Sequence, residues 1–173
     1  MTAWIVRLHT HDERALHALV LRRRPRLDRA MHAVTHLGDA AATITLTLVL
    51  MLGAVPGLRE AGVRAAMALA GSHLVVQLLK RTVSRARPRM PEGFAALVQA
   101  PDRFSFPSGH AASSLSVALA VASALPGPAA GGLLGLAALV GMSRCYLGVH
   151  YPGDVIVGWM LAALGLAGAG LVV

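Results

Sequence analysis

The chain has 173 residues, of which 55% are hydrophobic and only 14% are charged, and its mean hydropathy is +0.62. This composition leaves too little polar surface for a water-soluble globule and indicates an integral membrane protein with a single domain, residues 1–173. The net charge of +8 would suit nucleic acid in a soluble protein, but the basic segments lack interleaved aromatic residues, so we expect membrane lipids and a lipid phosphate as partners and no nucleic acid.

Residues 1–37 have an amphipathic pattern. Apolar side chains recur there at spacings of three and four, and arginine and histidine fill many of the positions between them. The pattern breaks near Pro25, so we expect two short helices lying at the membrane interface with their arginines toward the lipid headgroups; a solvated helical hairpin is the alternative. Residues 1–8 contain no long apolar stretch, and we expect no secretory signal peptide.

Five apolar segments follow, at about residues 39–55, 62–79, 108–125, 129–147 and 154–173. At about 1.5 Å of rise per residue, each is long enough, some only barely, to cross a hydrocarbon core of about 30 Å. The sequence therefore predicts an all-α, polytopic transmembrane bundle of about five spans over residues 38–173. Three polar segments accompany these spans: the first two lie between the second and third spans, and the third follows the fourth span. Spans one and two return the chain to its starting side and spans three and four do so again, which places all three polar segments on one face of the bundle.

The first polar segment carries Lys80 and Arg87-Pro88. A basic cluster at the end of a span is also what the positive-inside rule gives a generic membrane protein. His73 and Gln77, however, share one helix face with Lys80 and form a polar stripe that runs toward the same interface. We expect the two cations to bind a phosphoryl group and His73 to form a structural hydrogen bond inside the bundle.

The second polar segment is Pro107-Ser108-Gly109-His110, which opens the third apolar segment. Ser108 suits the N-cap of a helix, and Gly109 leaves the backbone N–H groups of the first turn accessible, as in an anion site. Capping does not explain a histidine in the first turn of a membrane helix. General acid catalysis is the chemistry that suits His110.

The third polar segment contains Ser143-Arg144, His150 and Asp154. Asp154 lies four residues after His150 across a tight turn, so its carboxylate can hold one imidazole nitrogen and leave the other free to attack. A neutral His150 is a competent nucleophile toward phosphorus.

Taken in order, the motifs Lys-x6-Arg-Pro, Pro-Ser-Gly-His and Ser-Arg-x5-His-x3-Asp resemble the signature of the type 2 phosphatidic acid phosphatase superfamily. The resemblance implies metal-independent hydrolysis of a lipid phosphomonoester or diphosphate, without a cofactor. It implies that His150 forms a phosphohistidine, that Asp154 orients it, and that His110 protonates the leaving oxygen and activates the water. It assigns the phosphate oxygens to five residues: Lys80, Arg87, Ser108, Gly109 and Arg144.

Candidate substrates are phosphatidic acid, phosphatidylglycerol phosphate and polyprenyl phosphates or diphosphates. The alternatives are a lipid phosphotransferase with the same intermediate, and a non-catalytic phospholipid-binding or transport protein, which would need the cations but neither histidine. A vanadate-dependent haloperoxidase is disfavoured by the apolar segments, and His9 and His11 lack a carboxylate or cysteine partner for a metal site. We expect a multi-pass protein of the cell membrane whose loop 90–103 covers the site; the facing of the site and the oligomeric state stay open.

Overall fold

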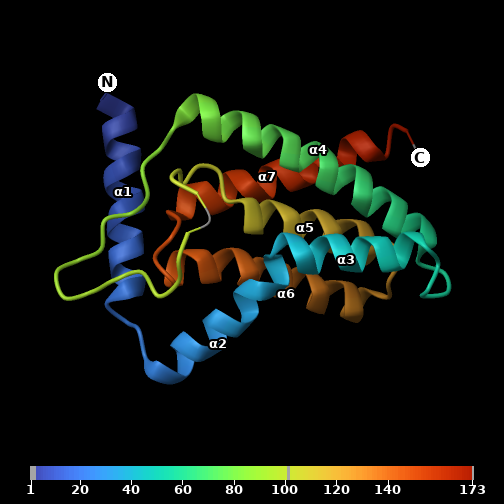
Figure 1. Cartoon of the computed structure of the whole chain (residues 1–173), viewed down its shortest axis with the longest axis horizontal. Helices are drawn as coiled ribbons and strands as arrows, with labels where there is room; N and C mark the ends of the chain where they lie inside the picture. The colour runs from blue at the N-terminus through green and yellow to red at the C-terminus, as the bar shows by residue number, and fades with distance from the viewer. Residues whose placement is uncertain (1–2, 101, 173) are drawn as a thin grey trace.

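The computed structural model describes residues 3–100 and 102–172, with side chains from residue 9 onward. Its helices are α1 (Ala3–Val20), α2 (Pro25–Thr35), the short 3-10 helix η1 (His36–Gly38), α3 (Ala40–Met51), α4 (Arg59–Val83), α5 (Gly109–Ala122), α6 (Gly127–Tyr146) and α7 (Pro152–Ala169) (Figure 1). Within the described residues no strand forms beyond one isolated bridge between Ala86 and Phe104. The predicted all-α class is therefore confirmed.

Helix α5 forms the centre of the bundle and packs against α3, α4, α6 and α7 (Figure 1). Most of its buried side chains are alanine or serine, so neighbouring backbones approach closely. A Cβ on Gly158 of α7 would lie 2.6 Å from the carbonyl oxygen of Ser108, and one on Gly165 would lie 2.7 Å from that of Ala68. Such close contacts between small residues stabilise a bundle in lipid, where apolar attraction between helices is weak.

The number of full-length spans is smaller than predicted. Helices α4, α6 and α7 are long and apolar enough to cross a membrane, and α2–η1 with α3, bent by 50°, can count as a fourth span. Helix α3 ends at Met51 rather than near residue 55, because Gly53 adopts a φ of +75° and turns the chain. Helix α5 has only 14 residues, but it lies where protein rather than lipid surrounds it. The five predicted segments thus correspond to α3–α7, and within the described residues three of these helices, or four with the bent pair, have the length and composition of a complete span.

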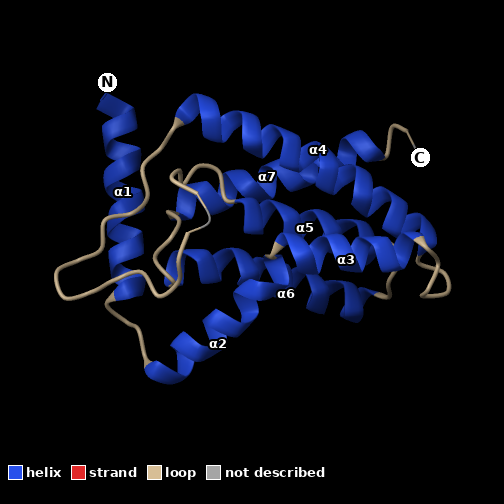
Figure 2. Cartoon of the chain, in the orientation of Figure 1, coloured by secondary structure: helices blue, strands red, loops and turns tan. Residues whose placement is uncertain are grey.

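The N-terminal region forms two helices separated at Pro25, as predicted. Helix α1 stands across the end of the bundle where the long loops gather (Figures 1 and 2). Its Leu16 and Val20 are buried in one cluster with Cys145, Tyr151 and Val155. Helix α2 packs along α6. The two helices therefore cover the end of the bundle at which the polar segments meet, and their position at a membrane interface stays a prediction.

Candidate active site

The three polar segments meet around one cavity of about 730 Å³. Six of the eight predicted site residues line it: Lys80, Arg87, Gly109, His110, Arg144 and His150. The other two, Ser108 and Asp154, are fully buried. Helix ends supply most of these groups, with Lys80 in the last turn of α4, His110 in the first turn of α5 and Arg144 in the last turn of α6. The structure thus brings together the segments that the even number of predicted spans placed on one face.

His150 lies in the short loop between α6 and α7, and its side chain is almost completely buried. Its Nε2 is 3.1 Å from Nη1 of Arg87, whereas its Nδ1 faces Oδ2 of Asp154 at 3.7 Å and has no hydrogen-bond partner. Burial, with the positive charge of Arg87 beside the ring, lowers the pKa of His150 from 6.5 to about 4. The imidazole is therefore neutral at physiological pH and can act as a nucleophile.

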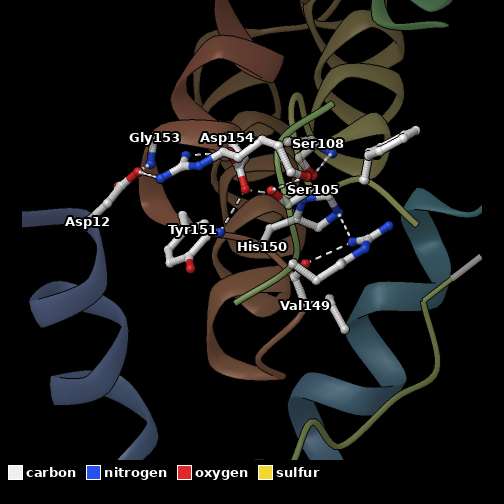
Figure 3. A network of polar contacts seen from close by, with 12 residues as sticks. Asp12, Ser105, Ser108, Val149, His150, Tyr151, Gly153 and Asp154 are labelled. Carbon is white, nitrogen blue, oxygen red and sulfur yellow. Dashed lines mark hydrogen bonds and ion pairs between the residues drawn. The ribbon is translucent and has the colours of Figure 1, made fainter. Parts of the chain in front are cut away.

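Asp154 is held by two donors in a fully buried position (Figure 3). Its Oδ2 accepts the backbone N–H of Tyr151 at 2.9 Å, and its Oδ1 accepts Nη1–H of Arg85 at 2.7 Å. The guanidinium of Arg85 also lies over the ring of Tyr151, 4.1 Å from its centroid. These contacts fix the carboxylate beside the Nδ1 edge of His150, which is the place that the sequence predicts for it.

Asp12 of α1 extends this network to the N-terminal region (Figure 3). Its Oδ2 accepts Nη2–H of Arg85 at 2.8 Å, and its Oδ1 accepts the backbone N–H of Gly153 at 2.7 Å. Neither Asp12 nor Arg85 is among the residues predicted from the sequence. Arg85 stands in the basic segment two residues before Arg87 and could have been suspected, whereas nothing in the sequence singles out Asp12.

The N-terminus of α5 is built as predicted around Ser108, whose hydroxyl accepts the N–H of Ala111 at 3.4 Å. A Cβ placed on Gly109 would meet no atom within 4 Å, so this turn is open to the cavity. The imidazole Nε2 of His110 lies 2.8 Å from Oδ1 of Asp39, whose Oδ2 lies 2.7 Å from Nδ1 of His36. Asp39 stands at the N-cap position of α3, but its side chain makes no capping bond and instead holds His110.

Arg144 is anchored by the N-terminal region. Its Nη1 donates to Oγ1 of Thr35, the last residue of α2, at 2.7 Å, and its buried Nε has no partner. The backbone carbonyl of Arg144 accepts the N–H groups of Val149 and His150 at 3.1 and 3.2 Å. One residue therefore positions both a cation at the cavity and the turn that carries the imidazole.

A carboxylate of the loop 90–103 forms ion pairs with the other two cations of the site, Lys80 and Arg87. Asp102 accepts a hydrogen bond from Nζ of Lys80 at Oδ2 and one from Nη2 of Arg87 at 2.8 Å at Oδ1. Partial burial would raise the pKa of Asp102, but the bonds from these two cations outweigh it and lower that pKa, so the group is ionised. The sequence predicts that this loop covers the site but gives no signal for Asp102. An anionic ligand has to displace this carboxylate or share the cations with it.

The prediction for His73 is wrong. The side chain does not point into the bundle: it is exposed and lines the cavity together with Gln77. Within the part of the chain that the structure describes, it bonds only to the amide of Gln77, with 3.1 Å between the two Nε2 atoms. A helix pattern gives the angle between side chains but not the direction in which the shared face points.

The body of the cavity is apolar. Below the cations it runs between α3 and α4, with walls formed by Ile44, Leu48, Met51, Ala66, Leu69 and Ala70. No group of three or more His, Cys, Asp or Glu in the described part of the chain is placed to hold a metal ion. The site therefore offers cations and imidazoles at one end and a hydrocarbon-compatible groove behind them.

Residues 61–172 match the sequence profile of the family described as the PAP2 superfamily. The chain belongs to this superfamily. It is 34% identical over 142 residues to the decaprenylphosphoryl-5-phosphoribose phosphatase of Mycobacterium tuberculosis, which covers 81% of this chain and 77% of that protein. The crystal structure of a transmembrane PAP2 type phosphatidylglycerolphosphate phosphatase from Bacillus subtilis is similar with a TM-score of 0.76 at 30% identity, covering 94% of this chain and 84% of that one. LpxE of Aquifex aeolicus shares the fold, with a TM-score of 0.80 at 24% identity, covering 91% and 93%.

Proposed function

We propose that this chain is a metal-independent phosphatase of the cell membrane that hydrolyses a lipid phosphomonoester or diphosphate through a phosphohistidine. The observation that carries the proposal is the two-part cavity, with three cations and two imidazoles at one end and apolar walls behind them. Membership of the PAP2 superfamily identifies the chain as a phosphoric ester hydrolase, and its apolar helices indicate a multi-pass membrane protein. The names of the relatives support a lipid phosphate as the substrate.

In the first step, Nε2 of His150 attacks phosphorus as the bond between phosphorus and the ester oxygen breaks. Nε2 is the attacking atom because Nδ1 faces Asp154, which holds the ring and stabilises the charge that develops on it. His110 gives a proton to the leaving oxygen, so the lipid leaves as a neutral alcohol, or as a monophosphate when the substrate is a diphosphate.

In the second step, His110 takes a proton from a water molecule whose oxygen attacks the phosphorus. The bond between nitrogen and phosphorus breaks, inorganic phosphate is released, and His150 returns to its neutral form. The same imidazole therefore acts as acid and then as base. Asp39, bonded to Nε2 of His110, supports the protonated form of this ring before the first step and after the second.

The phosphate oxygens are bound by the cations that line the cavity and by the N-terminus of α5. Lys80 and Arg87 exchange the carboxylate of Asp102 for phosphate oxygens, and Arg144 and Gly109 of α5, which line the same cavity, bind further oxygens. Their charges stabilise the transition state more than the ground state, because negative charge accumulates on the nonbridging oxygens as the nucleophile adds.

The test is phosphate release from phosphatidic acid, phosphatidylglycerol phosphate and undecaprenyl diphosphate by purified protein in detergent, with and without a chelator. We expect release that the chelator does not reduce, an acid-labile phosphoenzyme, and loss of both in His150→Ala. His11→Ala is the matched control, because His11 is exposed and lies outside the cavity.

Each competing function has its own result. Unchanged turnover in His150→Ala refutes the assignment of the nucleophile. Transfer of the substrate's phosphoryl group to an added acceptor lipid, with no release of inorganic phosphate, identifies a phosphotransferase. Phosphate binding without turnover of any of the three lipids identifies a binding protein.

A further inference from the structure

A polar pair lies in the cavity deeper than the cations, and the mechanism above does not use it. His73 and Gln77 stand on the face of α4 that carries Lys80, seven and three residues before it. At about 1.5 Å of rise per residue, Gln77 lies about 4.5 Å and His73 about 10 Å below Lys80 along the helix axis. Both side chains therefore line the stretch of cavity that connects the phosphate end with the apolar groove.

The pair keeps hydrogen-bond donors free. An amide nitrogen can only donate, so Nε2 of Gln77 donates to Nε2 of His73, and the proton of that imidazole is on Nδ1. Among the described residues, neither side chain makes another hydrogen bond. The Nδ1–H of His73 and the second amide N–H of Gln77 are thus available to an acceptor from outside the protein.

Neighbouring side chains on α3 and α4 do not offer free hydrogen-bond donors to the cavity in this way. Thr43 and Thr47 line the same cavity from α3, but their hydroxyls donate to backbone carbonyls of their own helix. Leu74 and Leu78, next to the pair on α4, are 73% and 60% exposed and do not line the cavity. An ionisable side chain within an apolar helix is costly unless it serves a cavity or a partner, and among the described residues Gln77 is the one partner of His73.

We propose that His73 and Gln77 form a subsite for a second phosphate of the lipid substrate, a phosphodiester that lies between the scissile phosphate and the hydrocarbon tails. This inference rests on the proposed function. Both phosphatase names reported above denote a lipid with a terminal phosphate and a second phosphate nearer the tail. The subsite selects such lipids over those in which the scissile phosphate is attached directly to the hydrophobic portion.

The experiment compares phosphatidylglycerol phosphate with phosphatidic acid of the same acyl chains, in mixed micelles, for wild type, His73→Leu, Gln77→Leu and the double variant. Hydrogen bonds to a charged group are strong enough that we expect kcat/KM for phosphatidylglycerol phosphate to fall about tenfold or more in the double variant. The fall appears mainly in KM, and kcat/KM for phosphatidic acid changes less than about twofold. Leu78→Ala, at an exposed position of the same turn outside the cavity, leaves kcat/KM for both substrates unchanged.

Activity on phosphatidic acid is the internal control for folding. An equal loss on both lipids, or no loss on phosphatidylglycerol phosphate, overturns the subsite while the proposed function stands. A wild-type protein that hydrolyses phosphatidic acid but not phosphatidylglycerol phosphate also overturns it. Failure of the wild type on both lipids refutes the proposed function, and the inference falls with it.

Discussion

Replacing Arg85 with glutamine removes the charged partner of a fully buried carboxylate. Arg85 donates to Asp154 at 2.7 Å and to Asp12 at 2.8 Å, and its own side chain is only 20% exposed. Without it, the side chain of Asp154 keeps the backbone N–H of Tyr151 as its one remaining close donor. Breaking a buried ion pair from one side costs about 3–5 kcal/mol, so we expect a clear fall in thermal stability.

The expected kinetic effect is on kcat. Arg85 does not line the cavity, so substrate binding and KM change little, whereas a loosened Asp154 no longer holds His150 for attack. Loss of an outer partner that orients a ligating histidine lowers activity about 10–100-fold in metal sites, and we expect a fall of that order here. Steady-state phosphate release and the rate of phosphoenzyme formation, both corrected for folded protein, measure it.

Two control variants distinguish a role of Arg85 in positioning Asp154 and His150 from a general loss of folded protein. Arg85→Lys keeps the charge but not the planar fork, and we expect an intermediate kcat. Arg81→Gln is the matched control, since Arg81 is exposed and its side chain makes no hydrogen bond within the described residues. If Arg85→Gln keeps kcat within about twofold of wild type, or loses only the fraction that is unfolded, the assignment of Arg85 as a positioning residue is refuted.

Three further predictions concern other parts of the site. Asp102→Asn should strengthen inhibition by inorganic phosphate severalfold, because the carboxylate no longer competes for two of the cations; unchanged or weaker inhibition would contradict this. The pKa of His150 is about 4 in the folded protein against an ordinary value of 6.5, so between these pH values the unfolded chain binds a proton that the folded chain does not, and stability falls on acidification by about 3 kcal/mol at most. Thermal unfolding at pH 7 and pH 5 should therefore show a larger loss of stability for wild type than for His150→Asn. Equal losses would exclude a neutral, buried His150. Gly158→Val should prevent folding because its Cβ would lie 2.6 Å from the Ser108 carbonyl, whereas Gly168→Val has open space; equal yields of both variants would show that α5 and α7 can separate.

The sequence predicts the parts of this protein that depend on short-range rules. Proline, glycine and capping residues mark helix ends, and an even number of spans between polar segments brings Lys80, His110 and His150 to one end of the bundle. Asp12 and Asp102 could not be predicted in the same way, because each acts on residues far along the chain and neither stands in a periodic pattern. The orientation of α4 is a further example, since the pattern at His73 is compatible with a face toward the bundle or toward the groove.

Helix α1 has a consequence for how this enzyme can be dissected. Asp12 bonds both Arg85 and the first turn of α7. A truncated protein that keeps only the apolar helices would therefore lose the carboxylate that supports the turn carrying His150 and Asp154. A chimera that borrows the amphipathic helix of another family member would need a carboxylate at the corresponding position. The opposite end of the bundle, where the described chain finishes beyond α7, is the better place for a tag or an attached reporter (Figure 1).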